Sequence, residues 1–374
     1  MKFHAPGILR INRKHSFTGL TDVSSKRQGI YVYPITPYTY KEGSNDYILR
    51  VKQYLDETFE VVNKPTRLGI LDIIIKLPKC NIIYLNWIED IVDKKFGYLQ
   101  VPLLFLLLLT CKLTGIRIAW FIHNDVSHSK KNFRLKKIIR KMMIHFADVS
   151  FCHSQQLSIK NQVRSLRVFD HPVEETELVQ EQTTTDYDLL VWGSVSPYKG
   201  IMDFAQFNYN SDKLNDQKIL VAGKFSSLKF YTEVLQFHKS NIELINKVQD
   251  EETLIDLFSR SKYVLFCYQS ASVLSSGALC KTLSYGKTII GPHLGAFKEL
   301  GEKGLIYTYN SFDELAEMLQ DADKHLMPID KQYIKQYIQK TSWQDFKNFL
   351  VENLSDTKVV SRKRRKKSAM VLVR

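Results

Sequence analysis

Residues 263–300, YVLFCYQSASVLSSGALCKTLSYGKTIIGPHLGAFKEL, decide the fold that we expect for this chain. The stretch opens with an apolar run of strand length and continues through small polar residues. It becomes helical in pattern from about Gly277 to Tyr285 and reaches a second apolar run at Thr288 to Ile290. A strand, a loop, a helix and a second strand in this order are typical of a parallel sheet covered by helices.

Ser275, Ser276 and Gly277 lie at the predicted start of this helix. Backbone N–H groups at a helix start are unpaired and carry the positive end of the helix dipole, so small residues there can admit a phosphate. An ordinary helix cap explains the same serines, and this motif alone does not separate the two. Gly286-Lys287-Thr288 ends like a P-loop, but Lys281 occupies the position of the earlier glycine and the triplet precedes a strand, so we reject a P-loop.

Charge is the unusual feature of the composition. The 374 residues are 44% hydrophobic and 25% charged, as in ordinary globular proteins of about two domains, but the formal net charge is +14. Such a surface attracts nucleic acid, anionic lipid or phosphorylated substrates. Residues 357–374 contain the run RKRRKK and no acid, and the cationic residues of 130–141 alternate with apolar ones at helical spacing. The second cluster therefore predicts a basic amphipathic helix.

Cysteine usage and hydropathy indicate a cytosolic chain. The five cysteines are Cys80, Cys111, Cys152, Cys267 and Cys280. Their odd number, wide spacing and lack of a CxxC pair argue against a disulfide framework or a zinc site. Residues 1–10 lack the apolar region of a cleavable signal peptide. The apolar run 101–109 is too short for the roughly 20 residues that span a bilayer, and we expect a buried helix there.

Residues 1–172 are expected to form a first domain. Strand-like runs lie at 29–35, 81–85, 117–122 and 149–153, with helical segments between them. The run 117–122 ends in His123 and Asn124, and polar residues at the carboxyl end of a strand in such a sheet usually face a ligand. A simple turn explains the pair equally well by position alone.

The polar stretch 173–185 breaks this pattern and predicts a linker. A second domain is expected over 186–335, with strand-like runs at 189–192, 219–222 and 242–245. The loop after its first strand contains Gly193 and Lys199, and the next strand ends in Gly223-Lys224. A single helix is expected over about 330–354. The segment 336–356 is expected to close the fold against the first domain, and a basic tail follows at 357–374.

Several of these pieces, in this order, resemble the GT-B glycosyltransferases, in particular the group 1 enzymes of glycosyltransferase family 4 that build bacterial exopolysaccharide and capsule. The matching pieces are YPITPYTYKEGSNDY, IIYLNWIED, AWFIHN, LLVWGSVSPYKG, LVAGKF and SSGALCKTLSYGKTIIGPHLGAFKEL, and Ser342-Trp343 resembles the family's last helix. The resemblance covers about 29–354. It implies an α/β fold of two Rossmann-like domains with a central cleft, the acceptor bound by 1–172 and the nucleotide sugar by 186–335.

The resemblance also implies roles for particular residues. Those assigned to the donor are Gly193, Lys199, Lys224, Val248, Ser275, Ser276 and Gly277. Lys199 would neutralise the donor diphosphate, Gly193 would let its loop approach closely, and Val248 would contact the base. His123, with Asn124 beside it, would lie nearest the reacting sugar and orient or polarise it. A departing diphosphate gains charge that fixed cations and helix starts stabilise, so we expect no metal and no cofactor besides the UDP- or GDP-linked sugar, which is a substrate.

Two positions depart from the family pattern. Many members carry two glutamates separated by seven residues where this chain has Val273 and Lys281, and the cation that often follows the first glycine is Ser194 here. Asp186-Tyr187-Asp188 spells the Asp-x-Asp metal site of the other common glycosyltransferase fold. Because it precedes a strand, at the wrong end for a ligand, we interpret it as a solvated linker.

We therefore expect a retaining hexosyltransferase that moves a sugar to a lipid-linked glycan at the inner face of the cell membrane. The basic segments would attract anionic headgroups there, although solvated cationic faces explain them as well. The missing glutamates keep open a GT-B scaffold without turnover. A nucleic-acid-binding protein that uses RKRRKK is a third hypothesis, but the chain lacks an RNP, zinc-finger or KH signature, and we expect no specific nucleic-acid partner.

Overall fold

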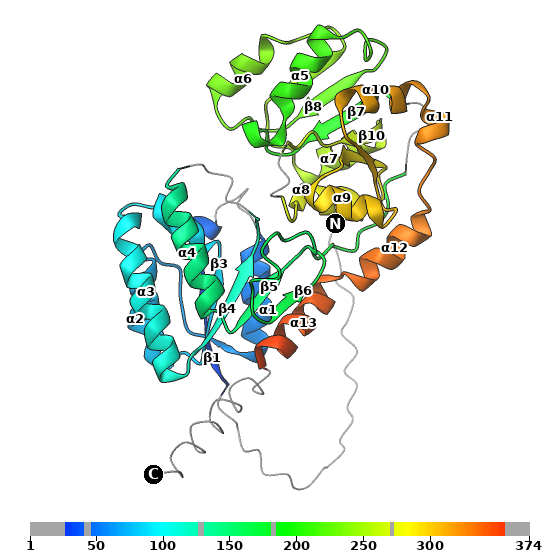
Figure 1. Cartoon of the computed structure of the whole chain (residues 1–374). Helices are drawn as coiled ribbons and strands as arrows, with labels where there is room; N and C mark the ends of the chain where they lie inside the picture. Colours follow the sequence, from blue (N-terminus) through cyan, green and yellow to red (C-terminus); the bar gives the residue numbers. More distant parts are fainter. Residues whose placement is uncertain (1–26, 41–45, 126–130, 181–184, 270–272, 356–374) are drawn as a thin grey trace, which may run out of the picture.

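The structure is a computed structural model that describes residues 27–40, 46–125, 131–180, 185–269 and 273–355. The predicted basic tail at 357–374 lies outside these residues, as does the first residue of the basic cluster 130–141. Two six-stranded parallel sheets, each flanked by helices, form two domains that face each other (Figure 1). This arrangement confirms the predicted fold class.

The first sheet has apolar faces on both sides. Its strands are β1 (Gly29–Tyr33), β2 (Glu60–Val61), β3 (Ile82–Asn86), β4 (Arg117–Ile122), β5 (Val149–Cys152) and β6 (Leu166–Val168), in the spatial order β2-β1-β3-β4-β5-β6. Its helical segments are η1 (Pro37–Tyr40), α1 (Tyr47–Thr58), α2 (Ile70–Lys76), η2 (Leu77–Lys79), η3 (Ile88–Asp93), α3 (Gly97–Thr114) and α4 (Phe133–Phe146). Because successive side chains alternate between faces, Tyr31 and Leu85 pack against α2, α3 and α4, whereas Val32 packs with α1 on the other face.

The second sheet reverses its strand order in the middle. Its strands are β7 (Tyr187–Trp192), β8 (Ile219–Ala222), β9 (Ile242–Ile245), β10 (Ser261–Leu265), β11 (Ile289–Pro292) and β12 (Tyr307–Tyr309), in the order β12-β11-β10-β7-β8-β9. Its helical segments are η4 (Pro197–Lys199), α5 (Ile201–Asn210), α6 (Leu228–Leu235), α7 (Glu251–Ser259), α8 (Gly277–Ser284), α9 (Gly295–Glu302), α10 (Phe312–Gln320) and α11 (Ala322–His325). Ligands of such sheets bind at the carboxyl ends of the strands beside the reversal, here β7 and β10.

The chain returns to the first domain through two helices. The expectation of one helix over 330–354 is wrong, because α12 (Lys331–Lys340) ends before Thr341 and α13 (Trp343–Ser355) begins after Ser342. The Ser342 hydroxyl accepts a hydrogen bond from Asp345 N (3.1 Å) and so caps α13. At the break, Val173 N donates to Thr341 O (2.9 Å). The two chain crossings between the domains therefore lie side by side, and α13 continues onto the first domain (Figure 1).

Polar contacts join the domains at the carboxyl-terminal edges of both sheets. The buried carboxylate of Glu299, on α9, accepts hydrogen bonds from Ser154 Oγ (2.5 Å) and Gln155 N (3.2 Å) of the first domain. The backbones of Asn124, after β4, and Val273, before α8, form an antiparallel bridge. The ligand-binding edge of one sheet is thereby held against that of the other.

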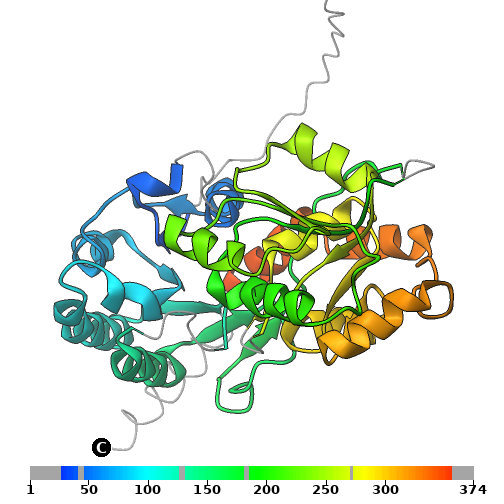
Figure 2. The same ribbon diagram turned by 90° about the horizontal axis from the view of Figure 1, so that it is seen from above.

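Helix α3 corrects the expectation that the apolar run 101–109 is buried. Leu104, Leu107 and Leu108 lie in the core, but Leu106 is 54% exposed and Leu113 is 79% exposed. By length and composition α3 could cross a membrane, yet one of its sides packs in this core. The physical reason is that α3 lies on the outer face of a single sheet between α2 and α4, and no further layer formed by the described residues covers its outward side (Figure 2).

Helix α13 supplies part of the first domain's core, which predicts that Phe346→Ala destabilises the protein. The Phe346 ring is fully buried among residues of β4, β5 and α1, and its removal should lower the free energy of unfolding by about 3–5 kcal/mol. Urea unfolding measures this difference. The exposed Gln344→Ala on the same helix is the control and should change stability by less than about 0.5 kcal/mol. Equal effects of the two substitutions would contradict the packing described here.

Candidate functional site

A cleft of about 510 Å³ lies between the two domains. Its lining residues are Asp46, Tyr47, Arg50, Trp87, His123, Asn124, His171, Pro172, Glu174, Thr176, Glu251, Ser275, Gly277, Cys280, Lys281, Ser284, Tyr285 and Trp343. The predicted residues His123 and Asn124 therefore line the same cleft as Ser275 and Gly277. Residues of the two crossing segments, such as His171 and Trp343, also line it.

His123 is held in one orientation and one tautomer. Asn86 Nδ2 donates to Tyr33 O (3.0 Å), so its Oδ1 accepts a hydrogen bond from His123 Nε2 (3.0 Å). The ring of Trp87 stacks on the imidazole with centroids 3.8 Å apart. Burial lowers the pKa of His123 well below its ordinary value, with a smaller contribution from His171. The imidazole is therefore neutral and leaves Nδ1 as a hydrogen-bond acceptor.

Two further histidines and a tyrosine support His123. The rings of His123, His153 and His171 have centroids 5.1, 5.5 and 5.7 Å from that of Tyr47. His153 Nδ1 donates to Phe169 O (2.9 Å), so Nε2 accepts from the Tyr47 hydroxyl (2.9 Å). Burial lowers the pKa of His153 well below its ordinary value and that of His171 to about 4. The cluster is uncharged at neutral pH.

Lys199 lies where the strand order of the second sheet reverses. It ends η4, directly after β7, and its Nζ lies 3.3 Å from Ser194 Oγ and 5.7 Å from the centre of the Tyr268 ring. Within the described part of the chain, no carboxylate forms an ion pair with Lys199. Burial lowers the pKa of Lys199 to about 8. A half-buried cation in such surroundings is suited to an anionic ligand.

Lys199 lies near the first turn of α8. A Cβ atom added to Gly193 would lie 3.6 Å from Lys199 Nζ and 3.7 Å from Ala278 Cβ, so Gly193 separates the lysine from the first turn of α8. The hydroxyl of Tyr268, beneath Lys199, lies 3.2 Å from Ser276 Oγ. Gly193 has φ +98°, in the left-handed region that favours glycine.

The start of α8 contains an ordinary helix cap and also leaves space for a ligand, the two interpretations that the sequence left open for its serines. Ser276 Oγ accepts a hydrogen bond from Leu279 N (3.3 Å), so the buried Ser276 side chain is an ordinary helix cap. Ser275 and Gly277 line the cleft, and a Cβ atom added to Gly277 would meet no atom within 4 Å. The space in front of the helix start is therefore open to a ligand.

Lys224 and Val248 lie at the same edge of the sheet and, like Gly193, Lys199 and Ser276, are not among the described residues that line the cleft. The Lys224 carbonyl accepts from Val195 N (2.9 Å), which places Lys224 beside the loop of Gly193, with its side chain exposed. Val248 follows β9, two strands from β7, and is 63% exposed. Their predicted contacts with phosphate and base stay predictions.

A carboxylate that was not identified from the sequence lines the cleft near Val273 and Lys281, the two positions where many family members carry glutamates. Val273 is buried, and Lys281 forms an ion pair with Glu251 of α7 (3.3 Å). Glu251 also accepts a hydrogen bond from the Tyr285 hydroxyl. An acidic side chain therefore lies beside α8, although it comes from 30 residues earlier in the chain.

The Asp-x-Asp sequence lies at the far edge of the sheet. Asp186 pairs with Arg260 (2.6 Å) and Asp188 with Lys262 (2.6 Å), at the amino end of β7. Neither aspartate lines the cleft formed by the described residues. Among the described residues, no group of three His, Cys, Asp or Glu side chains is placed to hold a metal ion.

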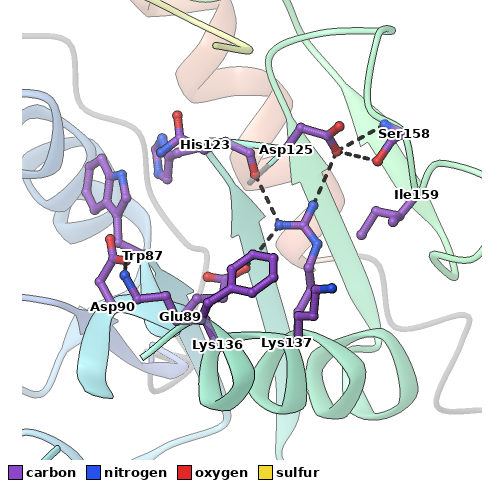
Figure 3. Close-up of a pocket in the computed structure, with 12 residues that line it drawn as sticks. Trp87, Glu89, Asp90, His123, Asp125, Lys136, Lys137, Ser158 and Ile159 are labelled. Carbon is purple, nitrogen blue, oxygen red and sulfur yellow. Dashed lines mark hydrogen bonds and ion pairs between the residues drawn. The ribbon is translucent and has the colours of Figure 1, made fainter. Parts of the chain in front are cut away.

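A second cavity, of about 230 Å³, adjoins the cleft (Figure 3). Trp87, His123 and Asn124 line both spaces. Within the second cavity, Arg140 donates to Asn124 O (3.2 Å) and lies 3.5 Å from Asp125 and 3.7 Å from Glu89. These carboxylates and the ring of Phe133, which also lines the cavity, offer hydrogen-bond acceptors and an apolar surface to a polyhydroxylated ligand.

Comparison with known proteins shows similarity in fold. No protein-family model and no curated protein matches the sequence. Among solved structures, Anabaena HepE in complex with UDP and glucose has 14% identity and a TM-score of 0.59, and the match covers 88% of this chain and 100% of HepE. A Rickettsia africae glycosyltransferase has 13% identity and a TM-score of 0.58, covering 90% and 99% of the two chains. AviGT4, a glycosyltransferase involved in avilamycin A biosynthesis, has 14% identity and a TM-score of 0.51, covering 87% and 96%. The chain therefore has the GT-B fold.

The buried histidines predict a loss of stability in acid. The pKa of His171 is about 4 in the folded protein against an ordinary 6.5, so between these values the unfolded chain binds a proton that the folded protein does not. The free energy of unfolding should therefore fall as the pH falls through this window. His171→Gln should reduce that slope by up to one proton, measured by urea unfolding at about pH 5 and about pH 7. The exposed Gln344→Ala changes no titratable group and should leave the slope unchanged, and an unchanged slope in His171→Gln would contradict the assignment.

Proposed function

We propose that the chain is a metal-independent glycosyltransferase that moves a hexose from a nucleotide-diphosphate sugar to a glycan acceptor. The observation that carries this proposal is the cleft in which His123 and Asn124 of the first domain share the lining with Ser275 and Gly277 at the start of α8. Lys199 lies near the first turn of that helix, with Gly193 between them. HepE has been solved in complex with UDP and glucose and in complex with UDP-glucose, which supports a UDP-linked donor. Membership in glycosyltransferase family 4 and retention of configuration are part of the proposal.

The second domain supplies positive charge to the leaving group. When the bond between the anomeric carbon and the diphosphate breaks, the diphosphate departs with the bonding electrons. Lys199 and the backbone N–H groups at the start of α8 stabilise the charge that develops there. These groups provide the electrostatic role for which a metal ion would otherwise be needed. Lys224 beside the Gly193 loop extends the cationic surface, and Val248 contacts the base.

The first domain supplies the acceptor site in this proposal. The cavity beside His123 is lined by Glu89, Asp90 and Asp125, whose oxygens accept hydrogen bonds from sugar hydroxyls. The acceptor oxygen forms the new bond to the anomeric carbon and its proton is released. His123 Nδ1 can accept from a hydroxyl of the transferred sugar, and with Asn124 it orients the reacting groups.

We also propose a lipid-linked acceptor in bacterial exopolysaccharide or capsule synthesis and a location on the inner face of the cell membrane. The net charge of +14 and the cationic surface of α4 support an anionic membrane as partner. The second candidate function is a GT-B scaffold that binds a nucleotide without turnover. Val273 and Lys281, at the positions of the usual glutamates, favour it, whereas Glu251 beside Lys281 favours the enzyme.

A panel of UDP- and GDP-sugars tests the proposed function, with release of the nucleoside diphosphate as the measurement. Lys199→Ala should weaken UDP binding at least about tenfold, because a charge-assisted contact is lost. The wild-type affinity should also fall as the pH rises through about 8, where Lys199 loses its proton. Lys335→Ala, an exposed lysine on α12, is the control. Binding without turnover would favour the scaffold, and unchanged UDP affinity in Lys199→Ala would remove Lys199 from the site.

Gly277→Ala separates ligand binding from folding. The added methyl group meets no protein atom within 4 Å, and alanine favours a helix by up to about 1 kcal/mol over glycine. The melting temperature should therefore stay the same or rise. The methyl group enters the open space in front of α8, so UDP affinity should fall in calorimetric titration. If UDP binds Gly277→Ala and the wild type equally well, the phosphates do not lie at this helix start.

A further inference from the structure

The outward sides of α2 and α3 form an apolar surface on the first domain. On α3, exposed apolar side chains recur at helical spacing along the helix: Tyr98, Leu99, Phe105, Leu106, Leu109 and Leu113. On α2, the exposed apolar side chains are Leu71, Ile74 and Ile75. The helices α2, α3 and α4 lie side by side on one face of the sheet, so their outward sides share one surface (Figures 1 and 2). We call the exposed side chains of α2 and α3 the apolar face.

The apolar face extends along the whole of α3. From Tyr98 to Leu113 it extends about 22 Å, at about 1.5 Å per helical residue. The only charged residue of α3 is Lys112, which forms an ion pair with Asp148 (2.5 Å) on the inward side. Contiguous apolar patches above a few hundred Å² mark sites that bind a protein or a membrane. The face therefore needs a partner that covers it.

Cations that are not neutralised border the apolar face. On α4, the buried Lys136 is paired with Asp90 and Asp93. In contrast, the exposed Arg134 and Lys141 form no ion pair with any residue that the structure describes. Neither α3 nor α4 contains an acidic residue. An apolar strip beside a row of cations is complementary to a bilayer with anionic headgroups, which presents acyl chains and negative charge together.

We infer that the apolar face docks on an anionic lipid bilayer, with α3 lying in the plane of the membrane interface. The helix does not cross the bilayer, because Leu104, Leu107 and Leu108 on its inward side belong to the core of the first domain. Inserting α3 across a membrane would expose the sheet beneath it. The outward leucines instead enter the boundary between headgroups and acyl chains, while the α4 cations contact phosphate groups.

Docking in this orientation also brings the second cavity to the membrane. Phe133 and Lys137, in the first turns of α4, line that cavity, and the same helix carries the cationic border of the apolar face. A glycan carried on a lipid could thus enter the cavity while its lipid stays in the bilayer. This consequence rests on the proposed function, whereas docking itself does not.

Cosedimentation of the full chain with phosphatidylcholine vesicles, with and without phosphatidylglycerol, tests the inference. The double variant Leu106→Glu/Leu113→Glu should lose at least about tenfold in affinity for both vesicles, because two leucines that enter the membrane on docking are replaced by charges. Arg134→Glu/Lys141→Glu should lose about tenfold or more only for the vesicles with phosphatidylglycerol. Leu228→Glu on α6, where the leucine is 75% exposed, and Lys335→Glu on α12 are matched controls that should bind like the wild type. All four variants change exposed residues, and circular dichroism should report unchanged melting.

Hydrogen exchange locates the contact independently of the variants. Anionic vesicles should slow amide exchange in residues 97–114 and 133–146. Binding that is insensitive to Leu106→Glu/Leu113→Glu, with exchange slowed only outside α2 to α4, would overturn the inference. So would a dimer in lipid-free solution that the same double variant dissociates while vesicles fail to bind, because a second copy would then cover the face. Turnover of nucleotide sugars is measured without vesicles, so failure of docking and failure of the proposed reaction are distinguishable.

Discussion

The arrangement of the two domains depends on a buried carboxylate between them. Glu299 of α9 accepts hydrogen bonds from Ser154 and Gln155 and lies 3.6 Å from Lys303, and a buried charge in this position tolerates little displacement, because each lost contact would leave more of its desolvation cost uncompensated. Asp170 adds a second link, since it pairs with Lys303 (2.5 Å) and accepts from the Tyr337 hydroxyl (3.0 Å). These contacts hold the carboxyl-terminal edges of both sheets against the cleft. Every property of the candidate site follows from that placement.

Burial lowers the pKa of basic side chains in both domains, but only those of the first domain become uncharged at neutral pH. In the first domain it keeps His123, His153 and His171 uncharged, which leaves a neutral, aromatic surface suited to a sugar. In the second domain it lowers the pKa of Lys199 only to about 8, so the lysine stays largely charged at neutral pH. A bound phosphate would offset the desolvation free energy of that half-buried charge. In the proposed function, neutral groups therefore lie at one end of the nucleotide sugar and positive charge lies at the other.

The outward side of α2 and α3 departs from the usual pattern of an outer helix. A single sheet with helices on both sides has outer helices with one side packed and one side free, and the free side is ordinarily polar. On α2 and α3 it is apolar, although Leu106 and Leu113 contribute nothing to the core of the first domain. Such a pattern is costly in water and is explained by a nonaqueous partner. The helix α4 connects this face to the second cavity, so a membrane and a substrate can be contacted from one element.

The sequence by itself determined the strand–loop–helix–strand order of 263–300, the placement of His123 and Asn124 at a strand end, and the position of Gly193 and Lys199 in the first loop of the second domain. These features follow from local periodicity and turn chemistry, which neighbouring residues carry. Asn86 could have been found by the strand-end rule that identified His123. The tertiary structure was needed to show that Glu251 reaches Lys281, that Tyr47 joins His153 106 residues away, and that α3 exposes one side of its leucine-rich surface. Contacts between distant segments depend on the strand order within each sheet and on how the two sheets face each other. Hydropathy shows how apolar a helix is, but it does not specify which side of the helix another layer covers.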